Sequence, residues 1–111
     1  MSEMNLNHYQ SLAGMTSGAG GDGDRRLIIA ALGLAGEAGE FANLVKKLTA
    51  HGHDIPLDEL SDELGDVLWY LAEAASACGL ELNHVATQNV DKLRARYPQG
   101  FSQERSINRQ G

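Results

Sequence analysis

Two pairs of acidic residues have the chemistry and the spacing of a metal site. Glu37 and Glu40 are three residues apart, as are Glu63 and Asp66. Residues at this spacing share one face of a helix, and both pairs lie in strongly helical sequence. Two helices joined by a short loop run antiparallel and can bring four carboxylates together. Clustered negative charges raise one another's pKa values unless a cation neutralises them. The pairs therefore predict a divalent cation with oxygen ligands, most naturally Mg²⁺.

The apolar pattern predicts the elements that position these carboxylates. Helices are expected over about 5–16, 25–49, 56–78 and 81–97, with a glycine-rich loop at 17–24. Asn5 and Asp24 are the expected N-caps, and Gly79 is expected to end the third helix. No segment requires a strand, so the predicted fold is all-α and four-helix bundle-like. At 111 residues the chain is expected to be a single domain, residues 1–111.

Three glycines inside the second predicted helix break the rule for a good helix former. Gly33, Gly36 and Gly39 each cost about 1 kcal/mol relative to alanine in a helix interior. Such a sequence is explained if a packed neighbouring helix or a bound ligand approaches the backbone closely.

Composition excludes several classes of partner. The net charge of −6 argues against nucleic acid or an anionic membrane as the main partner. The single cysteine, Cys78, excludes a disulfide within the chain and is expected to be a small buried residue. No signal peptide and no apolar run of membrane-spanning length is apparent, so a cytoplasmic location is expected.

Further side chains suit a nucleotide ligand, although each also has a structural interpretation. Tyr9, Trp69 and Tyr70 are candidates for stacking on a base, but for Tyr9 a place in the core is the preferred interpretation. Trp69 faces away from the leucine stripe of its helix, which suggests a second buried surface such as a subunit interface. On the last helix, Asn89 lies in the apolar stripe with Lys92 and Arg96 beside it. These three are either a structural asparagine with two solvated cations or a phosphate contact.

The segments GLAGEAGE and DELGDVLWYL have a more specific meaning together. They contain Glu37-Ala38-Gly39-Glu40 and Glu63-Leu64-Gly65-Asp66, the pattern ExxE, a spacer and ExxD. In this context the chain resembles the MazG-like, all-α nucleoside triphosphate pyrophosphohydrolase family. The similarity continues through NVDKLRARYPQGFS and SINR and so covers nearly the whole sequence.

The resemblance implies an activity and a set of site residues. Family members hydrolyse nucleoside triphosphates, often deoxy or modified ones, to the monophosphate and pyrophosphate through a metal-activated water. It assigns Mg²⁺, or Mn²⁺ as a substitute, to Glu37, Glu40, Glu63 and Asp66. Phosphate contacts fall to Asn89, Lys92 and Arg96, and Lys47 is added because it lies on the flank of the first acidic pair. Glu40 and Glu63 are the expected catalytic residues, and Glu40 is the preferred proton acceptor. The resemblance also implies a homodimer or homotetramer.

Two alternative functions compete with this interpretation. Phosphoribosyl-ATP pyrophosphohydrolase resembles the family in fold and acidic motifs, but its last acidic motif typically continues into a Tyr-His pair. Here Asp66 is followed by Val67-Leu68-Trp69-Tyr70, which disfavours it. The other alternative is a non-catalytic helical protein-interaction module. The glycines inside the helix and an acidic flank without pairing lysines argue against the module.

Overall fold

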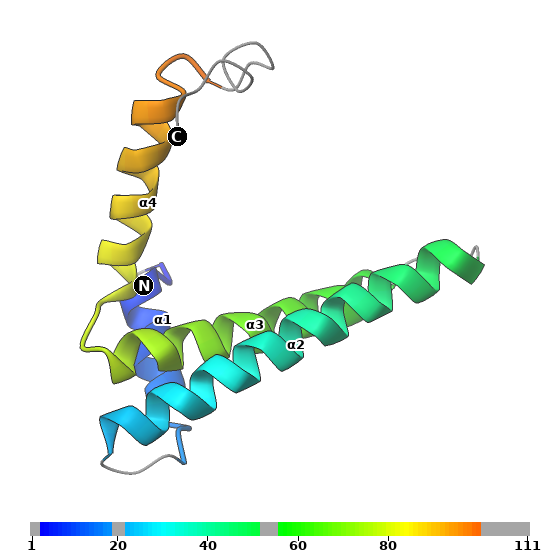
Figure 1. Cartoon of the computed structure of the whole chain (residues 1–111), viewed down its shortest axis with the longest axis horizontal. Helices are drawn as coiled ribbons and strands as arrows, with labels where there is room; N and C mark the ends of the chain where they lie inside the picture. Colours follow the sequence, from blue (N-terminus) through cyan, green and yellow to red (C-terminus); the bar gives the residue numbers. More distant parts are fainter. Residues whose placement is uncertain (1–2, 19–21, 52–55, 101–111) are drawn as a thin grey trace.

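The protein is described by a computed structural model over residues 3–18, 22–51 and 56–100, without the side chain of His51. This part of the chain forms four α-helices and no strand: α1 Leu6–Gly14, α2 Gly23–His51, α3 Leu57–Ala77 and α4 Leu82–Arg96 (Figure 1). The predicted all-α class and the four helices are confirmed. Each helix boundary lies within two residues of the prediction.

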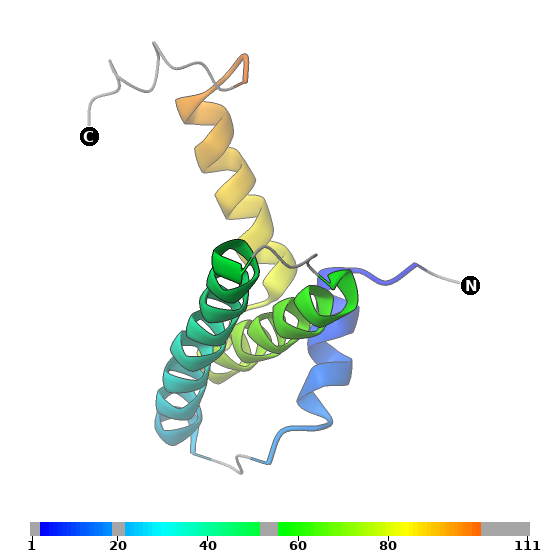
Figure 2. The same cartoon turned by 90° about the vertical axis from the view of Figure 1, so that its right-hand side faces the viewer.

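A long antiparallel hairpin of α2 and α3 dominates the molecule (Figure 1). The short α1 packs against α3 near the end where α3 finishes and α2 begins, and α4 contacts α1 and then projects away from the hairpin (Figures 1 and 2). The fold therefore separates the acidic pairs on the hairpin from the polar residues on α4.

Specific hydrogen bonds fix the ends of the helices. Asn5 caps α1 as predicted, because its Oδ1 accepts from the backbone N–H of His8 at 2.9 Å. The predicted cap of α2 at Asp24 is wrong. The carboxylate of Asp22 accepts from the backbone N–H of Asp24 at 3.0 Å, so the helix begins earlier, at Gly23. Gly79 ends α3 as predicted, with a φ of 72° that favours glycine.

The buried core is small and lies where α1, α3 and the start of α4 meet. It consists of Ala13, Ala72, Ala75 and Leu82, with Tyr9 and Trp69 packed against it. The indole N–H of Trp69 donates to the hydroxyl of Thr16 at 2.9 Å. The second surface predicted beside Trp69 is therefore formed by α1 of the same chain. Cys78, by contrast, is exposed and not buried as predicted, because it caps the end of α3.

Much of the apolar surface of the hairpin is uncovered. Leu32 is 70% exposed, Ile28 60% and Leu64 51%. The radius of gyration is 17.2 Å, whereas a compact chain of this length would have about 13 Å. Large apolar side chains exposed in this way are typical of an interaction surface.

Within residues 3–18, 22–51 and 56–100, one helix is long and apolar enough to cross a membrane by length and composition alone, namely α2 over Gly23–Ala50. Core helices of soluble proteins meet the same criteria. In this chain α2 lies along α3 and carries Glu37 and Glu40 near its middle.

Candidate functional site

Three of the four predicted carboxylates meet between α2 and α3. One carboxylate oxygen from each of Glu37, Glu63 and Asp66 lies within 4.8 Å of the other two. Glu37 comes from α2 and the other two from α3, so the antiparallel hairpin creates the cluster. Glu37 and Glu63 are half-buried, and Asp66 is exposed.

The cluster is short of hydrogen-bond donors. Oε2 of Glu37 and Oε2 of Glu63 are buried and accept no hydrogen bond from the described part of the chain. Buried carboxylate oxygens are normally paired. Burial raises the pKa of Glu37 above its ordinary value, and the charges of Glu40, Asp66 and Glu63 raise it further. A hydrogen bond to Glu63 acts in the same direction.

A hard divalent cation fits these residues on two grounds. The oxygens are close enough to share one ion, and two of them lack a partner that the ion would supply. The positive charge would also remove the repulsion that raises the pKa of Glu37.

Glu40 lies outside the group of three but next to it. The negative charge of Glu40 raises the pKa of Glu37, and the Glu40 side chain is exposed. It lines a cavity of about 330 Å³ together with Glu63 and Lys47. The hairpin thus brings Lys47, a predicted phosphate contact, to the same cavity as the two predicted catalytic glutamates.

The predicted residues of α4 are not brought to this cluster within one chain. Asn89, Lys92 and Arg96 are all exposed, and α4 projects away from the hairpin (Figure 1). The sequence pattern gave their positions on a helix but carried no information on where that helix points.

The three aromatic candidates lie on the side of the carboxylates away from Lys47. Tyr9 is close enough to Asp66 for that charge to raise its pKa, although burial is the larger cause. Trp69 and Tyr70 lie edge to face, with ring centroids 5.0 Å apart and planes at 88°. Both line a second cavity, of about 370 Å³.

The structure explains why one of the three unusual glycines of α2, Gly33, is a glycine. A Cβ at this position would lie 2.1 Å from Cε1 of Tyr70, so the ring of Tyr70 is able to lie against the backbone of α2. The expected close approach is therefore found at Gly33. At Gly36 and Gly39 a Cβ would meet nothing described within 4 Å.

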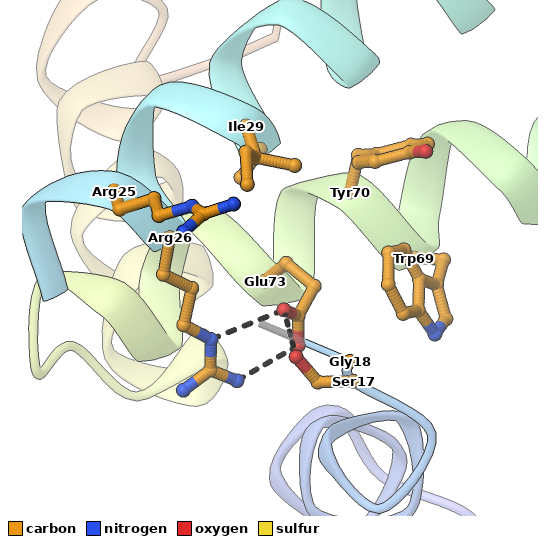
Figure 3. A pocket seen from close by; sticks show the side chains of 9 residues that line it. Ser17, Gly18, Arg25, Arg26, Ile29, Trp69, Tyr70 and Glu73 are labelled. Carbon is orange, nitrogen blue, oxygen red and sulfur yellow. Dashed lines mark hydrogen bonds and ion pairs between the residues drawn. The ribbon is translucent and has the colours of Figure 1, made fainter. Parts of the chain in front are cut away.

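The second cavity contains an ion pair that the sequence analysis missed. Arg26 donates to Glu73 through Nη2 at 2.8 Å and Nε at 3.1 Å, and Ser17 donates to the same carboxylate at 2.7 Å (Figure 3). Glu73 is only 4% exposed. The signal was present, because Glu73 is the single charged residue between Val67 and Leu80. A lone charge in an apolar helix predicts a buried partner.

Comparison with known proteins identifies a family whose domain matches most of this chain. The model of the MazG nucleotide pyrophosphohydrolase domain matches residues 28–101, which include all four acidic residues and α4. The Gene 37 protein of Mycobacterium phage L5 is 37% identical over 114 residues, covering 96% of this chain and 100% of the phage protein. No solved structure gives a significant match. Ser17, Arg25 and Arg26 precede the matched stretch.

Proposed function

The chain belongs to the MazG nucleotide pyrophosphohydrolase family, and we propose that it hydrolyses nucleoside triphosphates, deoxy or modified ones included, to the monophosphate and pyrophosphate. One observation carries the proposal. In a chain of this family, three carboxylates converge within 4.8 Å, and two of them keep a buried oxygen that accepts no hydrogen bond from the residues that the structure describes.

Glu37, Glu63 and Asp66 would hold Mg²⁺, or Mn²⁺ in its place, and Glu40 is near enough to join them. When bound, the metal neutralises phosphate charge and lowers the pKa of a coordinated water. The residues themselves orient the ion, because the hairpin fixes one ligand on α2 and two on α3.

The reaction needs a proton acceptor, and Glu40 and Glu63 are the candidates. A new bond forms from the water oxygen to the α-phosphorus, and the bond between that phosphorus and the α–β bridging oxygen breaks. The bridging oxygen leaves with pyrophosphate, and the proton of the water passes to a carboxylate and then to solvent. Glu40 suits this role because it is exposed and stands beside the group of three. Lys47 lines the same cavity and suits the departing pyrophosphate.

We propose that the protein acts as a homodimer or homotetramer. The uncovered apolar surface of the hairpin supports this assembly. The helix that carries Asn89, Lys92 and Arg96, α4, projects away from the hairpin of its own chain (Figure 1), so their proposed role in phosphate binding needs the cluster of a second chain. The basic last turn of α4 and the acidic hairpin are complementary in charge.

The test is a panel of standard and modified nucleoside triphosphates with Mg²⁺, together with phosphoribosyl-ATP, scored for monophosphate and pyrophosphate. Glu63→Gln should lower turnover at least about 100-fold, since it removes both a metal ligand and a candidate base. Asp58→Asn is the matched control, because Asp58 is exposed on the same helix and outside the carboxylate cluster. Full turnover by Glu63→Gln would refute the site. Cleavage of phosphoribosyl-ATP alone would replace the function by the biosynthetic one. Release of pyrophosphate from no compound would favour a non-catalytic module.

A further inference from the structure

The cavity beside the carboxylate cluster has the walls of a site for a flat ligand. Trp69 and Tyr70 give it an aromatic side, and Ile29 and Ala30 give it an aliphatic side. The hydrogen bond from Trp69 to Thr16 holds the indole in place. Its volume of about 370 Å³ lies within the range of small-molecule sites, about 300–1,000 Å³.

The buried ion pair in this cavity does not suit a phosphate chain. Arg26 is already neutralised by two hydrogen bonds to Glu73. The carboxylate of Glu73 is buried there and would repel an anion. A neutral ligand with a polar edge is compatible with a paired arginine and carboxylate.

Arg25 adds the unused hydrogen-bonding capacity. The Arg25 side chain lines the cavity, and Figure 3 shows it below Ile29 in that view. Among the described residues, the guanidinium of Arg25 makes no hydrogen bond or ion pair, and only its backbone N–H donates, to Asp22. A guanidinium has only donors, so it favours a ligand edge that presents acceptors. Glu73 already accepts three hydrogen bonds and has little capacity left for donors from a ligand.

The cavity also lies at a suitable distance from the carboxylates. Glu73 follows Asp66 by seven residues on α3, and Ala30 precedes Glu37 by seven on α2. At a rise of 1.5 Å per residue, each separation is about 10 Å. Lys47 lies ten residues beyond Glu37, toward the opposite end of the hairpin. The order along the hairpin is therefore cavity, carboxylates and lysine.

We propose that this cavity binds the nucleoside end of the substrate, and that Arg25 selects guanine and uracil over adenine. The inference rests on the proposed function for the substrate class, and it adds the orientation of that substrate. Guanine, through O6 and N7, and uracil, through O4, present acceptors that an arginine contacts well, whereas adenine and cytosine place an amino donor on the corresponding edge. The triphosphate then extends over the carboxylates toward Lys47.

Binding of nucleosides tests the inference without catalysis. Trp69 is the single tryptophan and lines the cavity, so its fluorescence reports occupancy directly. Guanosine, uridine and adenosine are titrated separately in EDTA. Guanosine should bind at least about fivefold more tightly than adenosine, the lower end of what one bidentate arginine contact discriminates, and uridine should also bind more tightly than adenosine.

Arg25→Gln should abolish that preference. Arg94→Gln, an exposed arginine of α4 outside this cavity, is the control and should leave it unchanged. In the enzyme assay Arg25→Gln should raise the KM for GTP with little change in kcat, because Arg25 is distant from the reacting phosphorus.

The outcomes separate the two proposals. Hydrolysis of triphosphates without nucleoside binding at Trp69 overturns the inference and leaves the proposed function standing. Selective nucleoside binding without hydrolysis supports the cavity and removes the proposed function. Adenosine bound as tightly as guanosine overturns the base selection. Displacement of guanosine by inorganic tripolyphosphate in EDTA overturns the orientation, because the cavity would then be an anion site.

Discussion

Replacing Arg26 by methionine should destabilise the protein, because it leaves the carboxylate of Glu73 buried without its cation. Glu73 is held by two hydrogen bonds from Arg26 and one from Ser17, and its side chain is 5% exposed. Breaking a buried ion pair in this way costs about 3–5 kcal/mol. The side chain of Arg26 is 25% exposed, and solvent screens part of the interaction, so we expect about 2–3 kcal/mol at pH 7.

The dependence on pH follows from the pKa of Glu73. The hydrogen bonds from Arg26 lower this pKa below its ordinary value of 4.5, although burial acts to raise it. A carboxylate with a lowered pKa in the folded state contributes stability that is fully present above its unfolded pKa. That contribution is lost as the pH falls through the folded value. Without Arg26, burial acts to raise the pKa of Glu73 in the variant, so the cost of the unpaired charge falls as that carboxylate takes up a proton. The difference in stability between wild type and Arg26→Met should therefore be constant near neutral pH and shrink as the pH falls toward 4.5 and below it.

The assay is urea unfolding followed by circular dichroism, at one protomer concentration because association would add to the measured stability. The matched control is the double variant Arg26→Met, Glu73→Leu, which removes both charges. It should lie within about 1 kcal/mol of wild type, since replacing a buried pair by apolar residues is often neutral. A single variant as stable as wild type at pH 7 would refute the reasoning. So would a double variant that is less stable than the single one.

Three further predictions concern the metal, the aromatic pair and the assembly. Removal of divalent metal by EDTA should lower the free energy of unfolding by about 2.7 kcal/mol if the metal was present at 100 times its Kd, and Tm should fall accordingly. An unchanged Tm would exclude a metal held by Glu37, Glu63 and Asp66. Because the pKa of Glu37 is raised in the folded state, its charged form opposes folding at neutral pH, so Glu37→Gln should raise Tm in EDTA and abolish the stabilisation by Mg²⁺. Gly33→Ala should displace the ring of Tyr70 and so change the fluorescence of Trp69. The control, Gly36→Ala, should leave the fluorescence unchanged and stabilise α2 by about 0.5–1 kcal/mol. Equal spectra for both variants would contradict the packing of Tyr70 against α2. If α4 completes the site of a second chain, a mixture of inactive Glu63→Gln and Lys92→Gln subunits should recover about a quarter of wild-type activity after exchange, since half of the dimers are mixed and each has one intact site; no recovery would show that Lys92 serves no other chain.

The secondary structure and three members of the acidic cluster could be predicted because their causes are local. Helix boundaries depend on apolar periodicity and on capping side chains, which are read within a few residues. The wrong cap of α2 was also a local error, since Asp22 and Asp24 are both good capping residues and lie two residues apart. The meeting of Glu37 with Glu63 and Asp66 followed from two helices and a short connection, which leave an antiparallel hairpin as the simple arrangement.

The tertiary structure decided what no local pattern contains. The direction of α4 depends on how the chain leaves the turn at Gly79 and packs on α1, so the sequence could place Lys92 on a helix but not relative to Glu37. The contact of Trp69 with α1 and the pairing of Arg26 with Glu73 join segments far apart in the chain. Such contacts are selected by burial and charge neutralisation in the folded state. The sequence by itself thus determined the helices and the meeting of three carboxylates between two of them, and the tertiary structure determined the cavity beside them.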